Sequence, residues 1–144
     1  MNRTVVLACL SAIILGSGFS QTSARAQGAP FAGKKITCAE ALVQAPKDDP
    51  ELVPLAKALA NADAKLNKAP KAPAAQKAVV DAAFKYGDTL MHLAQGKLTP
   101  PVQYRAALAL FRKALAIDPK HKGSLSEKQA IDDIYRGMPG GIPK

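Results

Sequence analysis

The stretch "YRAALALFRKALAIDPK", residues 104–120, decides the fold because its apolar residues occupy two sides of one helix. At helical spacing, one stripe contains Tyr104, Ala107, Leu108, Phe111 and Leu115, and a second contains Ala106, Leu110, Ala114 and Ile117. A helix at the edge of a two-layer fold needs only one apolar stripe. We therefore expect this helix to be packed on both sides by other helices, and Asp118-Pro119 to end it.

Capping signals predict two helices before this one. Thr37 and Glu40 have the spacing of a capping box, which begins a short helix that ends at about Ala45, before Pro46. Asp49-Pro50-Glu51 combines a helix cap, a first-turn proline and a first-turn acid. It therefore predicts a second helix, which ends at the prolines that follow Asn67.

Two more helices complete the predicted fold. An apolar stripe at helical spacing predicts a helix from about 73 to 94; its members are Val79, Ala82 or Ala83, Tyr86, Leu90 and Leu93. Ser124 and Glu127 match a second capping box, and Gly137 marks the end of the last helix. No segment alternates long enough to predict a strand. We expect an all-α fold, a small antiparallel bundle of about five helices over residues 37–137 without a sheet, and an irregular tail over residues 138–144.

Residues 1–26 have the organisation of a secretory signal peptide. A basic start at Arg3 precedes an apolar run, and small residues follow at Ala24 and Ala26. The apolar run is shorter than the roughly 20 residues that a membrane-spanning helix needs. We expect cleavage after Ala26, a flexible lead-in over residues 27–36, no transmembrane segment, and a mature protein that is periplasmic or secreted.

The mature chain is basic. Because Arg3 and Arg25 leave with the signal peptide, 18 basic residues remain against 11 acidic ones, a net charge of +7. Such an excess favours acidic partners, although a well-solvated surface has the same composition. Arginine clusters with stacking aromatic residues are missing from the sequence, so we do not expect nucleic-acid binding.

The cysteine and histidine residues do not indicate a catalytic or metal-binding site. Cys38 is the only cysteine outside the signal peptide, and it is either a buried inert thiol, which the usual burial of cysteine favours, or a partner in an intermolecular disulfide. Asp88 and His92 lie one turn apart, a spacing typical of a surface ion pair. The sequence holds no haem motif, phosphate-binding loop or activated nucleophile. We expect no metal, no cofactor and no enzymatic activity.

The helix pair over residues 73–117 resembles a tetratricopeptide repeat. In its second helix the matching positions are Ala107, Phe111, Ala114, Leu115 and the following Pro119. In its first helix only Gly87 keeps the residue of the repeat, and Ala83, Tyr86 and Leu90 are substitutions at its large, aliphatic and aromatic positions. The unit is about eight residues longer than the standard repeat, and the surplus lies in the connection "GKLTPPVQ".

This resemblance implies a scaffold whose first repeat helix lines a groove for a peptide or protein segment. The residues that it places there are Asp81, Phe84, Lys85, Asp88 and His92. Asp88 stands where carboxylate-clamping members of the family use lysine or asparagine, which argues against such a clamp. A single repeat cannot bury its own faces. The helices after Cys38 and Glu51 are expected to form a degenerate preceding unit; a partner or a second copy of the chain could complete the array instead.

Two functions follow from the sequence. The first is an exported, non-enzymatic scaffold of the bacterial envelope that binds a protein or peptide. The alternative is a small structural or surface-adsorbing protein that acts through its net positive charge.

Overall fold

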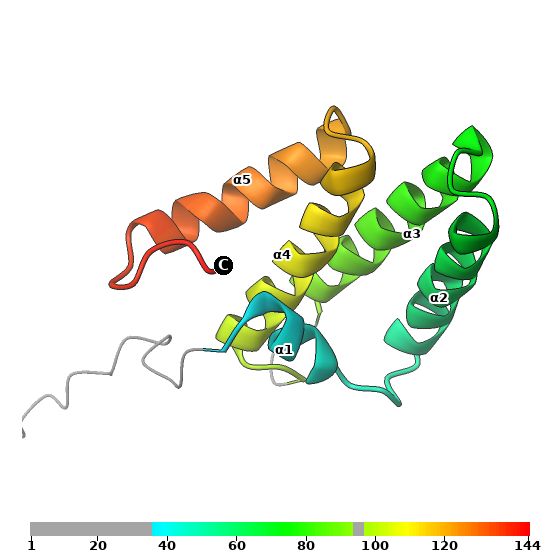
Figure 1. The fold of residues 1–144 in the computed structure, drawn as a ribbon. Helices are drawn as coiled ribbons and strands as arrows, with labels where there is room; N and C mark the ends of the chain where they lie inside the picture. The colour runs from blue at the N-terminus through cyan, green and yellow to red at the C-terminus, as the bar shows by residue number, and fades with distance from the viewer. Residues whose placement is uncertain (1–35, 94–96) are drawn as a thin grey trace, which may run out of the picture.

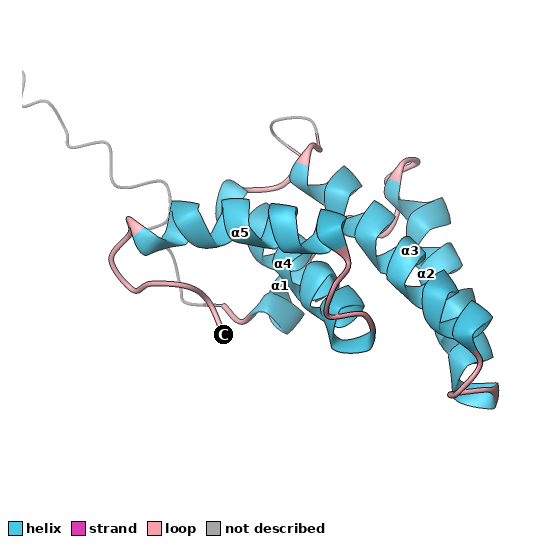
Figure 2. Cartoon of the chain, turned by 90° about the horizontal axis from the view of Figure 1, so that it is seen from above, coloured by secondary structure: helices cyan, strands magenta, loops and turns pink. Residues whose placement is uncertain are grey.

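Five helices make up the described part of the chain. The computed structural model describes residues 36–93 and 97–144, so the predicted signal peptide lies outside the described residues. The helices are α1 (Cys38–Val43), α2 (Leu52–Lys68), α3 (Pro73–Met91), α4 (Pro100–Ile117) and α5 (Lys122–Arg136), shown in Figure 1. No strand occurs in these two ranges, which Figure 2 also shows. The predicted all-α fold is confirmed.

The predicted packing of α4 on both sides is also confirmed. Helices α2 to α5 follow one another with short connections, and each packs against the next. Helix α4 contacts α3, α1 and α5, and in Figure 1 it lies between α3 and α5. Six of its residues, from both apolar stripes, are buried: Ala106, Ala107, Leu108, Leu110, Phe111 and Ala114. Two apolar stripes were needed because α4 is the centre of the core.

The approach of α3 to α4 depends on a glycine. A Cβ atom added to Gly87 would lie 2.8 Å from Cε1 of Phe111, a ring with no exposed surface. Gly87 itself is buried within α3. The absence of a side chain at this position therefore gives the Phe111 ring its place between the two helices.

The capping box of α1 forms as predicted, and Asp49 accepts the expected bonds before α2, although α2 begins only at Leu52, after the predicted first-turn residues Pro50 and Glu51. At α1 the Glu40 amide donates to Thr37 Oγ1 at 3.2 Å, and the Thr37 amide donates to Glu40 Oε2 at 2.7 Å. Before α2, Asp49 Oδ1 accepts hydrogen bonds from the Glu51 and Leu52 amides. These bonds satisfy amides that have no partner inside a helix.

The predicted start of the last helix is wrong. Helix α5 begins at Lys122, and its N-cap is His121, whose Nδ1 accepts a hydrogen bond from the Ser124 amide at 3.2 Å. Ser124 is fully buried in the first turn instead of standing ahead of it. The local pattern could not show this, because the cap comes from a histidine whose ring packs edge-on against Phe84, with the ring centres 5.1 Å apart.

Helices α1 and α2 do not form the expected preceding unit. Helix α1 packs against α4, and no contact joins it to α2. Residues 137–144 are irregular as predicted, but this tail is held in place: Arg112 donates to the Pro143 carbonyl oxygen at 2.6 Å. The same guanidinium donates to Cys38 Sγ at 3.4 Å, so Arg112 links α1, α4 and the tail.

Candidate binding site

The five residues that the repeat resemblance placed in a groove divide among different surroundings on α3. Asp81 is exposed and pairs with Lys77 on the same helix. Asp88 and His92 pair with each other at 3.5 Å on the helix surface. Lys85 is exposed and lines a groove between α2 and α3.

Phe84, which the repeat resemblance placed in the groove, is instead partly buried. Its side chain packs against the core, with its ring centre 6.1 Å from that of Phe111 and 5.1 Å from that of His121. A Cβ atom added to Gly123 would lie 2.8 Å from the Phe84 ring, so α5 begins directly over it. Phe84 is a packing residue between α3, α4 and α5, because helix α5 starts earlier than its sequence pattern indicated.

The groove beside Lys85 is the candidate binding site. It has a volume of about 530 Å³ and is lined from α2 by Pro54, Leu55 and Ala58, from α3 by Ala82, Lys85 and Thr89, and from the preceding turn by Glu51. On α3 seven residues separate its two ends, about two helical turns or roughly 10 Å, and along the other wall the same interval runs from Glu51 in the turn to Ala58 on α2. Apolar side chains dominate the surface between the two helices.

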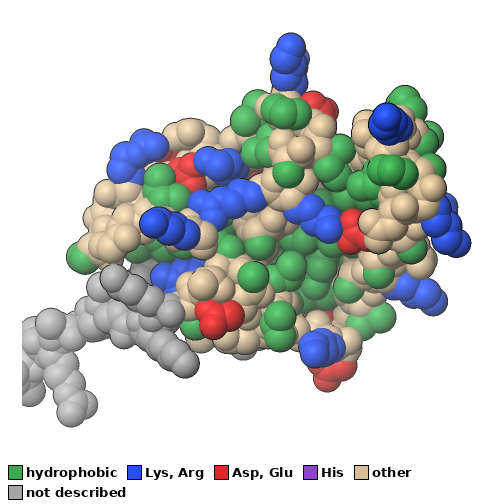
Figure 3. Space-filling view, viewed as in Figure 1, with side chains coloured by type: hydrophobic (Ala, Val, Ile, Leu, Met, Phe, Trp, Pro, Cys, Tyr) green, Lys and Arg blue, Asp and Glu red, His purple; other side chains and the backbone are tan. Residues whose placement is uncertain are grey.

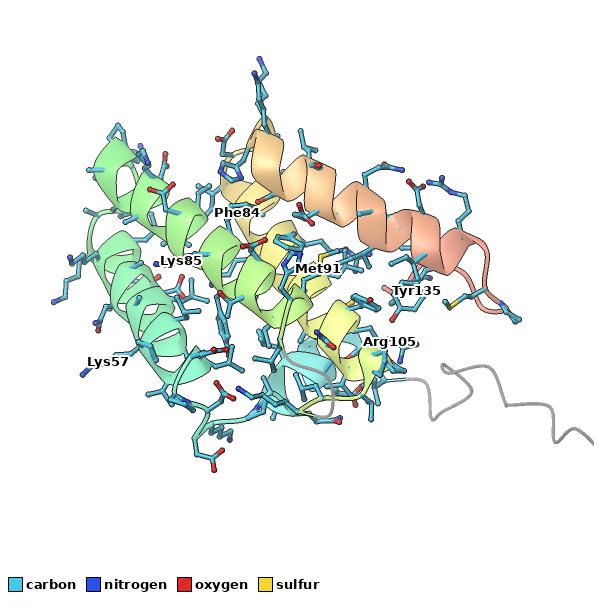
Figure 4. All side chains as sticks on the ribbon, turned by 180° about the vertical axis from the view of Figure 1, so that it is seen from behind. Lys57, Phe84, Lys85, Met91, Arg105 and Tyr135 are labelled. Carbon is cyan, nitrogen blue, oxygen red and sulfur yellow. The ribbon has the colours of Figure 1, made fainter. Side chains whose placement is uncertain are left out.

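Two charged residues of opposite sign line this groove. Glu51 stands at one end, where its carboxylate lies 3.9 Å from Lys97 Nζ. Lys85 lies midway along α3, and among residues 36–93 and 97–144 it has no ion pair. Figure 4 shows Lys85 on the face seen from behind, with Lys57 on the neighbouring α2. Lys85 is therefore the charge that remains available to a partner.

The end of the groove at Glu51 is fixed by an ion pair. Lys97 Nζ lies 2.8 Å from Asp49 Oδ2, and Asp49 is almost completely buried. The hydrogen bond from Lys97 lowers the pKa of Asp49 below its ordinary value, and the same bond raises the pKa of Lys97. Both groups are therefore charged at neutral pH, and they hold the start of α2 against the connection between α3 and α4.

A row of lysines runs along the solvent side of α2. Lys57, Lys65 and Lys68 lie within about 80° of one another around the helix, opposite the apolar stripe of Leu52, Leu59 and Ala62. All three are exposed, and in the part of the chain that the structure describes they form no ion pair. Figure 3, which has the same view as Figure 1, shows basic side chains scattered between apolar patches on that face of the molecule.

Cys38 is buried in the core, with 6% of its surface exposed. Burial raises the pKa of its thiol, against the opposing effect of the nearby Arg112 and Arg105 charges. A buried thiol with a raised pKa is a poor nucleophile and is not accessible to a second chain. The structure thus favours the inert interpretation over an intermolecular disulfide.

The acidic pair near the C-terminus is divided between the core and the surface. Asp132 is buried and pairs with Lys128 one turn earlier, whereas Asp133 is exposed and pairs with Arg136. Within the described residues no group of three or more His, Cys, Asp or Glu side chains is arranged to hold a metal ion.

Sequence reasoning found Lys85 but missed the α2 wall of the groove. Leu55 and Ala58 carry no sequence signal for a binding site, because a groove depends on how two helices are set against each other. Comparison with protein-family models, with curated proteins and with solved structures found no match to this chain. In the two described ranges no helix has the length and hydrophobicity needed to cross a membrane.

Proposed function

We propose that this protein is an exported, non-enzymatic helical scaffold that binds a segment of a protein partner in the groove between α2 and α3. The observation that carries the proposal is the groove itself, in which an apolar floor lies beside the exposed amine of Lys85. Buried polar groups usually have partners, whereas the groups at a binding surface are left available for a ligand. The spacing that resembles a tetratricopeptide repeat supports a role in protein binding.

Site-specific photocrosslinking in the bacterial envelope tests this proposal. A photoreactive residue at Thr89, inside the groove, is expected to capture a defined partner, and one at Leu125 on α5, which is 45% exposed, is not. The capture must also be lost in Ala58→Phe, which fills the groove from an exposed position, and kept in Ala60→Phe, which is exposed on the other side of α2. Equal capture by both photoreactive positions contradicts the proposal.

Export is tested separately. Intact-mass measurement of the protein recovered from the envelope fraction is expected to show a chain that begins at or near Gln27. A soluble species that retains residues 1–26 overturns the proposed compartment.

The lysine row on α2 favours a second candidate function, adsorption to an anionic surface. Lysines near an anionic bilayer contribute about 1 kcal/mol each, and this attraction fades with ionic strength. Binding to anionic vesicles that is abolished when Lys57, Lys65 and Lys68 are replaced by Gln, and is lost at high salt, supports this alternative. Binding in a groove with an apolar floor is expected to persist at high salt.

A further inference from the structure

We infer that the segment bound between α2 and α3 is an amphipathic helix with acidic side chains, presented by another protein. This inference rests on the proposed function and specifies its partner. Three observations carry it: the shape of the groove, the chemistry of its floor, and the charges along its length.

The shape of the groove fits the ridge of a helix. On α2 the lining positions Pro54 and Ala58 are four residues apart, and on α3 Ala82, Lys85 and Thr89 follow the spacing i, i+3, i+7. A third helix presents ridges with these same intervals, and ridges pack into the groove between neighbouring rows. Ala58 and Ala82 are small, so a helix backbone can approach to the usual separation of about 8–10 Å.

The chemistry of the floor disfavours an extended peptide. The backbone amides and carbonyls of α2 and α3 are engaged within their own helices, and most of the lining side chains are apolar. An extended segment would bring its own backbone groups onto this floor with few partners there, which is costly. A helix satisfies its backbone internally and presents only side chains.

Charge selects an acidic helix. Lys85 lines the groove without an ion pair among the described residues. Lys65 lies 11 residues after Pro54 and 7 residues after Ala58, so the helical period places it on the same face of α2 as these two residues. Glu51, the acid at the opposite end, is near Lys97. The available charge is therefore positive in the middle of the groove and beyond Ala58. A partner with Glu or Asp beside its apolar ridge complements it, whereas a second copy of this basic chain does not.

The experiment uses the mature chain and four synthetic peptides of 18 residues. The first forms a helix with leucines at i, i+3, i+4 and i+7 flanked by glutamates. The second carries lysine and the third carries glutamine in place of each glutamate. The fourth is the acidic peptide with two central prolines, which prevent a helix. Affinity is measured by fluorescence anisotropy at physiological salt. The acidic helix is expected to bind about tenfold or more tighter than the other three.

Variants place the binding in the groove. Lys85→Glu is expected to weaken the acidic helix by about tenfold and to strengthen the lysine peptide. The matched control is Lys120→Glu, because Lys120 is exposed on the turn between α4 and α5 and its amine has no ion pair among the described residues. Lys128 is unsuitable as a control, since it pairs with the buried Asp132. Ala58→Phe is expected to abolish binding, and Ala60→Phe to leave it unchanged.

The outcomes separate this inference from the proposed function. If the lysine, glutamine or proline peptide binds as tightly as the acidic helix, and Ala58→Phe abolishes that binding, the acidic-helix inference is overturned while the groove stands. If no peptide is affected by Ala58→Phe, the inference is overturned, and the proposed function loses its site. Loss of all peptide binding at high salt, with equal effects of Lys85→Glu and Lys120→Glu, also overturns the inference and favours the lysine row.

Discussion

Replacing Gly87 by alanine tests the packing of α3 against α4. In an unobstructed helix this substitution stabilises a protein by about 1 kcal/mol, because alanine loses less backbone entropy than glycine. Here the new methyl group would lie 2.8 Å from one carbon of the Phe111 ring and 3.1 Å from two others. The ring is fully buried, so it cannot swing into solvent to relieve the contact.

The magnitude follows from these two opposing effects. Overpacking of a core typically costs about 1–3 kcal/mol, and three close contacts on an enclosed ring favour a value of at least ~2 kcal/mol. After the helix-propensity gain of about 1 kcal/mol, we expect Gly87→Ala to destabilise the protein by ~1 kcal/mol or more. In a domain of this size, that is a fall in Tm of about 4–8 °C for each kcal/mol.

The assay is thermal and urea unfolding of the wild type, Gly87→Ala, Phe111→Leu and the double variant. If the ring causes the strain, Gly87→Ala in the Phe111→Leu background becomes neutral or stabilising, and the cycle gives a coupling of ~1 kcal/mol or more. Gly137→Ala is the control, because an added methyl group there meets only a backbone oxygen at 3.9 Å. A Gly87→Ala variant more stable than the wild type refutes the reasoning.

Two further predictions concern the core and the acid range. Phe111→Ala is expected to lower the free energy of unfolding by about 3–5 kcal/mol. Arg112→Ala is expected to lower it by only ~1 kcal/mol, since it removes hydrogen bonds to Cys38 Sγ and to the tail. Equal shifts of the urea midpoint in the two variants count against α4 as the centre of the core. Because the pKa of Asp49 is lowered by Lys97, its stabilisation is present above the ordinary carboxyl pKa and is lost as pH falls through the lowered value. The asparagine of Asp49→Asn can still cap the helix, so this variant isolates the charge of Asp49. The difference in unfolding free energy between wild type and Asp49→Asn should therefore shrink below about pH 4. A difference that stays constant from pH 7 to pH 2 contradicts a stabilising role of the Asp49 charge.

The features that the sequence predicted are local ones. Thr37 with Glu40, and Asp49 with the residues after it, define caps within three or four residues, so their hydrogen bonds could be read directly from the spacing. The two stripes of α4 likewise predicted a helix packed on both sides, because a helix with two apolar faces must bury both. In these helices the residues that determine the structure lie close together in the sequence.

The features that were missed depend on residues far apart in the chain. Nothing near Cys38 indicates that α1 packs on α4, since its partners there lie far along the chain, among them Arg112, 74 residues later. His121 became a cap because Phe84, on another helix, gives its ring a packing surface. Asp132 is buried because α5 turns that side toward the core, where Lys128 compensates its charge. None of these contacts has a signature in the local sequence.

The same distinction explains why the candidate site lies between α2 and α3, with Lys85 as the only member of the predicted α3 row that lines it. Helix α4 is surrounded by neighbours, whereas in the described part of the chain α2 packs closely against α3 alone and is joined to α4 by the ion pair of Lys113 with Asp63. Helix α2 therefore keeps free sides, one forming the apolar groove with Lys85 and one carrying Lys57 and Lys68, with Lys65 at the border between the two. Both candidate functions draw on this edge of the fold. They differ in whether burial of apolar surface or long-range charge supplies the binding energy, and only the second fades steeply as salt is added. The salt dependence of binding, measured beside Ala58→Phe, therefore identifies which free side of α2 meets the partner.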